Sequence, residues 1–258
     1  MSLNKACAIL DYDGTLSRLR QGWPEYMREF FFRTAFPKGF YSTTASELEV
    51  ACSEKLNHFI KNAAGTHYET QIDILFDALK ELQRPFSYEK TTNDYLQFNK
   101  QWVEDRLLQH RENKTLDQLL LVDAEQMLIT LKEQGYDLFL LSGTGSKELK
   151  YECQFLGITH YFQEIIGYTQ DAPDPFKPKV IANILRQGNY NAPSSLVIGD
   201  GLTELKAGRE NNCQCIAIAI DEELGFGIDP LKAECQQAHD FYSIVTDLAD
   251  FSEHLEQI

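Results

Sequence analysis

Residues 6–16 read Ala-Cys-Ala-Ile-Leu-Asp-Tyr-Asp-Gly-Thr-Leu, a short apolar run that ends in two aspartates and a glycine. An apolar run of this length is typical of a buried strand, and Asp and Gly directly after it favour a turn. The stretch therefore predicts a strand over residues 6–10. It places the carboxylates of Asp11 and Asp13 where that strand ends. A turn without any chemical role is the alternative interpretation.

The same arrangement, a strand followed by polar residues and glycine, occurs twice more. Residues 140–145 read Leu-Leu-Ser-Gly-Thr-Gly, and residues 197–204 read Val-Ile-Gly-Asp-Gly-Leu-Thr-Glu. In open α/β sheets, ligands bind where the carboxyl ends of parallel strands meet. Glycines there let backbone N–H groups approach an anion. We therefore expect Ser142 and Asp200 to lie at the same sheet edge as the two aspartates.

The outer parts of the chain predict the α/β fold class. Continuous apolar strands that alternate with helices indicate a parallel sheet covered on both faces, here a doubly wound one. We expect strands over 6–10, 136–141, 195–198, 213–220 and 241–245, and helices over 124–134, 147–156, 177–187 and 203–211.

Residues 17–118 have a different pattern, with helical periodicity and no strand of comparable clarity. Breaks at Pro37 to Gly39 and at Arg84-Pro85 separate the expected helices. An all-helical block that follows the first strand of an α/β unit is most simply an inserted domain. We therefore expect a catalytic core of residues 1–16 and 119–258 and a helical cap domain of residues 17–118, with helices over 25–35, 47–62, 68–82 and 88–112.

Composition and charge limit the possible partners. The chain of 258 residues has a net charge of −15, a field that repels polyanions, so we expect no nucleic-acid partner. No apolar run reaches the ~18–20 residues that cross a bilayer, so we expect no membrane partner. The first apolar run is too short and too soon acidic for a signal peptide. The six cysteines include no Cys-x-x-Cys pair, and we expect them to be free thiols, mostly buried. These features favour a cytoplasmic protein.

The predicted sheet edge gathers several carboxylates. Asp11, Asp13, Asp200 and Glu204 would repel one another strongly unless a cation compensated them. Ligand sets made only of oxygen suit Mg²⁺. The residues therefore predict a magnesium site. The alternative for Asp200 and Glu204 is ordinary acidity at a helix N-terminus.

Carboxylates, a metal ion, a hydroxyl group and a lysine are what phosphoryl transfer needs. The metal and a lysine neutralise the transferred group while a nucleophile attacks in line. Asp11 as nucleophile would form an aspartyl-phosphate, and Asp13 could protonate the leaving oxygen and then activate water. Ser142, Gly143 and Lys177 are the expected phosphate-binding residues. Lys179 could replace Lys177, and Ser142 could be only a helix cap.

These motifs, in this order, resemble those of the haloacid dehalogenase superfamily: Asp11-Tyr-Asp-Gly-Thr-Leu16, Ser142, Lys177-Pro178, and Gly199-Asp200 with Glu204. The resemblance implies that Asp11 is the nucleophile and a metal ligand. It implies that Asp13 is the acid/base and gives its backbone carbonyl to the metal, with Asp200 as the remaining ligand. Glu204 stands where Asp is commoner, so direct ligation and indirect support both stay open. An acid at position 13 points to phosphate esters rather than to dehalogenation.

A weaker resemblance covers residues 18–25 and 65–71, which are similar to a phosphoglycolate phosphatase-like subgroup of that superfamily. It suggests substrate contacts at Arg20, Trp23, Thr66 and Gln71. Other interpretations stay open, because Arg20 could be a solvated charge and Trp23 could be a hydrophobic staple for the next helix.

The function predicted from the sequence is a Mg²⁺-dependent phosphomonoesterase of a small phosphorylated metabolite. A phosphomutase like β-phosphoglucomutase is the main alternative, since it would pass the phosphoryl group to a second hydroxyl. A non-enzymatic phospho-acceptor module is a third hypothesis, which Asp13 disfavours because it would speed dephosphorylation. The sequence leaves the oligomeric state open between monomer and dimer.

Overall fold

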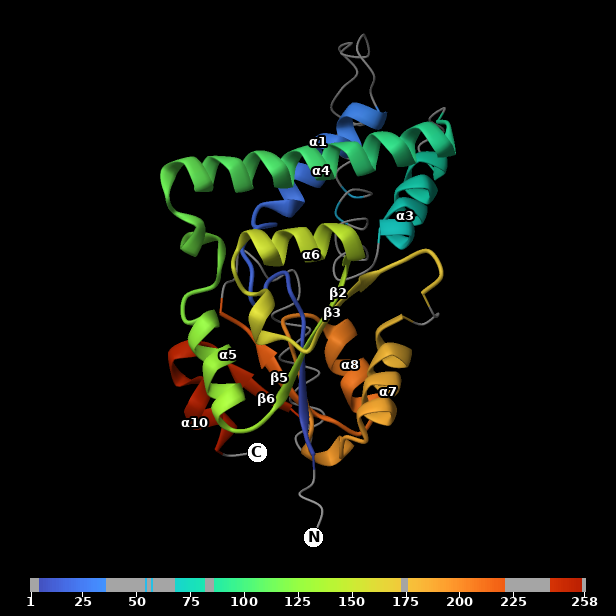
Figure 1. The fold of residues 1–258 in the computed structure, drawn as a ribbon. Coiled ribbons are helices and arrows are strands. Elements are labelled where there is room, and N and C mark those ends of the chain that lie inside the picture. The colour runs from blue at the N-terminus through green and yellow to red at the C-terminus, as the bar shows by residue number, and fades with distance from the viewer. Residues whose placement is uncertain are drawn as a thin grey trace. The chain divides into compact units, whose positions relative to one another are not determined.

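The computed structural model describes residues 5–35, 54, 57, 68–81, 86–172, 176–220 and 242–256 (Figure 1). The chain divides into two compact units. One unit combines Met1–Gln21 with His110–Ile258, and the other is Gly22–Gln109. The first unit contains the sheet, and the described part of the second is helical.

The first unit is built on a six-stranded parallel sheet with the order β3-β2-β1-β4-β5-β6. The first strand in the chain lies in the middle of the sheet, with Ile9 paired to Phe139 on one side and to Val197 on the other. This order confirms the predicted doubly wound sheet. The strands are β1 Cys7–Leu10, β2 Asp137–Gly145, β3 Glu164–Tyr168, β4 Leu196–Gly199, β5 Gln214–Ile218 and β6 Tyr242–Val245.

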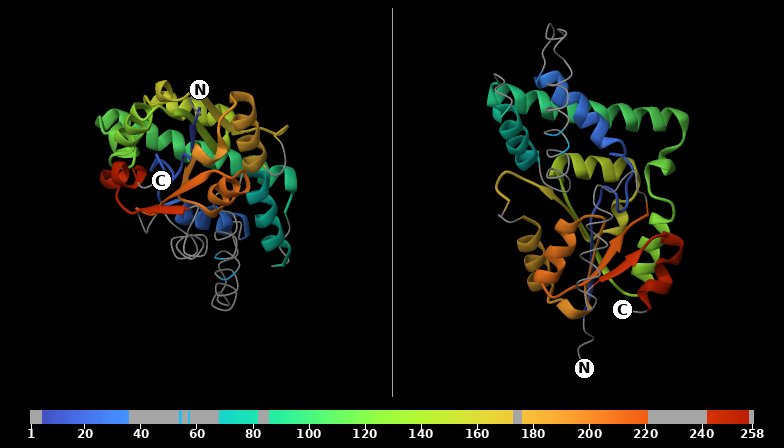
Figure 2. Two further views of the ribbon diagram at one scale, coloured as in Figure 1. Left: turned by 90° about the horizontal axis from the view of Figure 1, so that it is seen from below. Right: turned by 180° about the vertical axis from the view of Figure 1, so that it is seen from behind.

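Helices cover both faces of this sheet. Figure 1 shows α5 and α10 on one side of the sheet and α7 and α8 on the other, and the view from behind in Figure 2 agrees. α6 packs on β2 and β3. The bounds are η1 Leu116–Leu119, α5 Ala124–Glu133, α6 Ser146–Phe155, η2 Thr159–Tyr161, α7 Phe176–Gly188, η3 Ala192–Ser194, α8 Leu202–Glu210, η4 Leu248–Asp250 and α10 Phe251–Leu255.

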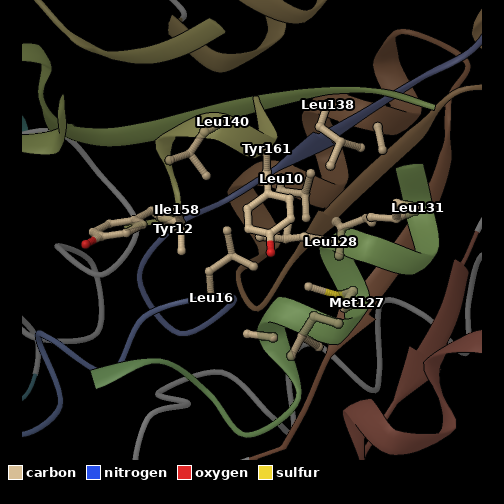
Figure 3. Packing of buried hydrophobic residues seen from close by; sticks show 14 of the residues in the cluster. Leu10, Tyr12, Leu16, Met127, Leu128, Leu131, Leu138, Leu140, Ile158 and Tyr161 are labelled. Carbon is tan, nitrogen blue, oxygen red and sulfur yellow. The ribbon is translucent and has the colours of Figure 1, made fainter. Parts of the chain in front are cut away.

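Alternate strand residues form the core under α5, α6 and α10. Leu10 of β1 and Leu138 and Leu140 of β2 pack there against Met127 and Leu128 of α5 (Figure 3). Each fully buried leucine stabilises the fold by about 1.5–3 kcal/mol. A central strand buried on both faces needs apolar residues at every position, which is why β1 reads as an uninterrupted apolar run.

The opposite face of the sheet packs against α8 at very short range. A Cβ on Gly208 of α8 would lie 2.7 Å from Sγ of Cys215 and 2.8 Å from Cβ of Val197, so only glycine fits there. Four cysteines are buried free thiols, as predicted: Cys7, Cys153, Cys213 and Cys215. Cys52 and Cys235 lie outside the described residues.

The second unit contains three described helices, α1 Trp23–Ala35, α3 Tyr68–Glu81 and α4 Tyr88–Asn113, the last of which continues into the first unit. They enclose an aromatic core in which Tyr26 stacks on Phe98 and Trp102, at ring distances of 4.1 and 4.3 Å. The helix expected over 47–62 falls in a stretch of which only residues 54 and 57 are described. None of the described helices is long and apolar enough to cross a membrane.

Two segments of the α/β unit, residues 16–18 and 119–121, run side by side. The backbone N–H of Arg18 donates to the carbonyl of Leu119 at 2.7 Å, and that of Leu121 donates to the carbonyl of Leu16 at 2.9 Å. A bridge between Ser17 and Leu120 lies between these bonds. This pairing ties Ser17 and Arg18 to residues 119–121 within the α/β unit, which includes residues up to Gln21 and from His110 onward.

Candidate active site

The candidate site lies at the carboxyl ends of the central strands, where the strand order reverses. β1 has β2 on one side and β4 on the other, the position at which doubly wound sheets bind ligands. Asp11 directly follows β1, and its backbone N–H donates to the carbonyl of Ile198 in β4 at 2.9 Å. Ser142 lies within β2, and Asp200 directly follows β4. The sheet therefore brings the three polar stretches to one edge.

A tight turn directly after Asp11 packs against Asp200 at the end of β4. Gly14 has φ +78°, and a Cβ there would lie 2.1 Å from Oδ2 of Asp200, so both conformation and space require glycine. The hydroxyl of Thr15 accepts from the backbone N–H of Asp200 at 3.1 Å and lies 3.4 Å from its Oδ1. The turn and the end of β4 are thus held together by a residue outside the predicted site.

A buried lysine joins two of the predicted acids. Nζ of Lys177, in the first turn of α7, lies 2.9 Å from Oδ1 of Asp11 and also donates to Oε1 of Glu204. All three side chains are buried. Lys179, the alternative at the sequence level, is exposed. A buried ion pair needs close geometry to offset the loss of hydration, and Lys177 provides it for Asp11.

Glu204 uses its extra methylene to reach the lysine. Its second oxygen, Oε2, is buried without a hydrogen-bond partner. A buried carboxylate oxygen left in this way is costly unless a cation or a donor lies near it. The contact of Oε1 with Lys177 fits support of that lysine, and the unpaired Oε2 fits direct ligation of a cation, so both roles of Glu204 stay predictions.

Asp11 and Asp200 are the acids best suited to hold a cation. Burial and the negative charge of Asp11 raise the pKa of Asp200 to about 8, and burial also raises the pKa of Asp11. Such a pair of oxygen ligands fits Mg²⁺, which also binds waters and substrate oxygens. Within the described ranges, no three side chains of His, Cys, Asp or Glu form a metal-binding group. The carboxylate of Asp13 instead accepts a hydrogen bond from Arg20, and that of Glu204 accepts one from Lys177.

Asp13 is held by two donors. Nη1 of Arg20 lies 3.0 Å from Oδ1 of Asp13 and 3.2 Å from Oδ2, and the hydroxyl of Thr144 donates to Oδ2 at 3.2 Å. Arg20 also binds Glu152 of α6, a buried acid. The sequence did not reveal Glu152, because a glutamate within an amphipathic helix is ordinarily exposed. Thr144 belongs to the glycine-rich stretch after Leu141, and its place in that stretch was the only sequence feature that pointed to a role in the site.

Ser142 and Gly143 lie in the extended end of β2. Oγ of Ser142 is buried and accepts from the backbone N–H of Thr144 at 3.1 Å. The pairing of β2 with β3 is irregular between Leu141 and Gly145, which is where the strand passes the site. The irregularity places Ser142 and Gly143 at the same edge of the sheet as Asp11 and Asp200, and their role in binding phosphate stays a prediction.

The four predicted substrate residues are divided between the two units, and one of them is not described. Trp23 is the first residue of α1 and packs against the aromatic core of the helical unit, and Gln71 accepts a hydrogen bond from the hydroxyl of Tyr95. Thr66 lies outside the described residues. Arg20 belongs to the α/β unit, where it is paired with two acids.

A doubly wound sheet with a buried Asp–Lys pair and further acids at its switch point is typical of the class of α/β proteins that bind ligands at this edge of the sheet. Within that class, the chain belongs to the haloacid dehalogenase-like hydrolase family, whose model matches residues 8–218. This match confirms the resemblance on which the sequence interpretation rests.

Two curated relatives are phosphatases. The phosphoglycolate phosphatase of Aliivibrio fischeri is 28% identical over 99 residues, which cover 37% of this chain and 42% of that enzyme. The glyceraldehyde 3-phosphate phosphatase of Pyrococcus abyssi is 23% identical over 165 residues, which cover 62% of this chain and 68% of that enzyme. The chain thus aligns with less than half of the first relative and about two thirds of the second.

The fold also occurs in a solved structure of another activity. The β-phosphoglucomutase from Clostridium difficile matches with a TM-score of 0.61 over 98% of each chain, at 15% identity. At this identity the likeness concerns the fold alone.

Proposed function

We propose that this protein is a Mg²⁺-dependent phosphomonoesterase of a small phosphorylated metabolite and that Asp11 is its nucleophile. The observation that carries the proposal is the buried contact between Asp11 and Lys177 at the switch point of the sheet. Membership in a hydrolase family and two phosphatase relatives support the same reaction class.

In the first step, a carboxylate oxygen of Asp11 attacks phosphorus, and the bond from phosphorus to the ester oxygen breaks. Asp13 gives its proton to that leaving oxygen. In the second step, Asp13 takes a proton from water, whose oxygen attacks phosphorus and releases the carboxylate of Asp11. Lys177 orients Asp11 and balances the negative charge of the transferred group, with Ser142 and Gly143 as further phosphate ligands.

Mg²⁺ would be held by the carboxylates of Asp11 and Asp200 and by the backbone carbonyl of Asp13. When bound, it neutralises charge on the phosphoryl oxygens. Glu204 supports Lys177 in this proposal. A role of the helical unit as a cap that selects substrate, through Trp23, Thr66 and Gln71, stays a prediction.

The test is orthophosphate release from a panel of phosphate monoesters that includes phosphoglycolate and glyceraldehyde 3-phosphate. The proposal predicts release from some members with Mg²⁺, none with excess chelator, and none from the Asp11→Asn variant. Release that persists in chelator would remove the metal from the mechanism. Release by the variant would remove Asp11.

A phosphomutase would use the same residues and pass the phosphoryl group from Asp11 to a second hydroxyl of a sugar. The shared fold with a β-phosphoglucomutase is why this alternative is kept. Conversion of a sugar 1-phosphate into the 6-phosphate without steady orthophosphate release would favour it. A passive phospho-acceptor would keep its phosphate after a single transfer.

We also infer a cytoplasmic location. The buried free thiols support it, since cytoplasmic conditions keep thiols reduced. Reduced cysteines in protein isolated under alkylating conditions would agree with it, and disulfides there would contradict it.

A further inference from the structure

Helix α6 contains a buried acid that the proposed mechanism does not use. Glu152 is only 1% exposed, and its carboxylate meets Arg20 through two bonds, Nη1 to Oε2 at 2.9 Å and Nη2 to Oε1 at 2.7 Å. Such a two-pronged pair fixes the plane of the guanidinium group as well as its position. Because a buried carboxylate requires a partner, the arginine is held firmly by α6.

The same guanidinium group contacts the proposed acid/base. Nη1 of Arg20 lies 3.0 and 3.2 Å from the two oxygens of Asp13, while the Thr144 hydroxyl binds Oδ2 at 3.2 Å. The carboxyl group of Asp13 is thus contacted by donors from two other segments of the chain. Free rotation about its last side-chain bond would break these bonds, so its orientation is defined.

The backbone that carries Arg20 is fixed as well. The N–H of Gln21 donates to the carbonyl of Arg18 at 2.9 Å and closes a turn with Arg20 inside it. Leu19 is fully buried, and its N–H donates to Oγ of Ser17 at 3.0 Å. The arginine is therefore placed before any substrate arrives, at low entropic cost.

We propose that Arg20 is a positioning residue that orients the carboxyl group of Asp13 and that Glu152 is its buried anchor. This inference rests on the proposed function, in which Asp13 gives a proton to the leaving oxygen. It replaces the substrate contact expected of Arg20 from the sequence. Loss of a substrate contact would weaken the binding of all substrates, whereas loss of a positioning residue would slow only the steps that need proton transfer.

The test compares two substrates that differ in their need for an acid. An alkyl phosphate requires protonation of its leaving oxygen, whereas 4-nitrophenyl phosphate has a leaving group that departs without it. The value of kcat/KM reports the steps up to the first transfer. In Arg20→Lys and Glu152→Gln we expect it to fall about 10–100-fold for the alkyl phosphate, and less than about 3-fold for 4-nitrophenyl phosphate.

Asp137→Asn is the matched control. It weakens an ion pair of similar length, 2.9 Å between Lys5 and Asp137, where β2 begins, at the other end of the strand from the site. We expect no change with either substrate. Glu152→Gln keeps the size of the side chain and an oxygen that can accept a hydrogen bond from Arg20, but it removes the charge, so it is preferred to Glu152→Ala. Thermal unfolding shows that each variant is folded.

The outcomes separate the two claims. Equal losses with both substrates would assign Arg20 to substrate binding and overturn the inference. Unchanged kcat/KM in both variants would also overturn it, and in either case the proposed phosphatase activity would stand. Absence of turnover by the wild-type protein would overturn the proposed function, and with it the role of Arg20.

Discussion

Nζ of Lys177 lies 2.9 Å from Oδ1 of Asp11, in a site where both side chains are buried. A lysine in this position holds the carboxylate at the end of β1 and provides positive charge next to it. The contact joins α7 to the central strand of the sheet. It gives the proposed nucleophile a defined orientation before any substrate binds.

Asp11→Asn should lower the rate of orthophosphate release by more than about 10³-fold, because an amide cannot form the covalent intermediate. Asparagine has almost the same shape, so the fold should persist. Orthophosphate release and circular dichroism measure the two effects. Retained turnover in a folded variant would show that Asp11 is not the nucleophile.

Asp13→Ala should lower hydrolysis of an alkyl phosphate by about 10²–10⁴-fold, the usual contribution of acid–base catalysis. Steady-state kinetics with Mg²⁺ measure it. Asp123→Ala is a suitable control, since that acid precedes α5 and is exposed. An unchanged rate in the Asp13 variant would mean that another group transfers the proton.

Asp200→Asn and Glu204→Gln should separate metal binding from support of Lys177. The first variant should raise the Mg²⁺ concentration needed for half-maximal activity about 10-fold or more, since it removes a charged ligand. The second should leave that concentration nearly unchanged and weaken inhibition by orthophosphate, because Lys177 loses a partner. A large shift in the Mg²⁺ requirement of Glu204→Gln would instead make Glu204 a direct ligand.

Gly14→Ala should destabilise the α/β unit and lower activity. Alanine at φ +78° costs about 1–2 kcal/mol, and its Cβ would displace the Asp200 carboxylate. Gly157→Ala is a close control, since Gly157 also has φ +78° but has nothing within 4 Å of an added Cβ. Thermal unfolding should show that both variants lose stability through the strained backbone. Activity assays should show a loss only in Gly14→Ala. Loss of activity in both would assign the effect to stability.

Much of the α/β unit could be predicted from local patterns. Apolar runs predicted five of the six strands, because a buried parallel strand requires apolar residues at successive positions. β3 was missed. It is a short edge strand, Glu-Ile-Ile-Gly-Tyr, whose glutamate and glycine interrupt the apolar pattern.

The site shows where sequence patterns stop being informative. Motif spacing singled out Asp11 and Lys177, and the structure brings their side chains into contact. The motif spacing gave no sign that Arg20 would contact Glu152, since a pairing between residues 132 positions apart depends on how α6 packs. Long-range ion pairs of this kind follow from tertiary structure and have no local signature.

The most direct test of the central claim is to trap the intermediate. The protein is mixed with a substrate and Mg²⁺, quenched with acid within milliseconds, reduced with borohydride and mapped by peptide mass spectrometry. An aspartyl-phosphate is reduced to homoserine, so the account predicts homoserine at position 11 and none in substrate-free controls. Unmodified Asp11 at a time when turnover is under way, or homoserine at another aspartate, would contradict it.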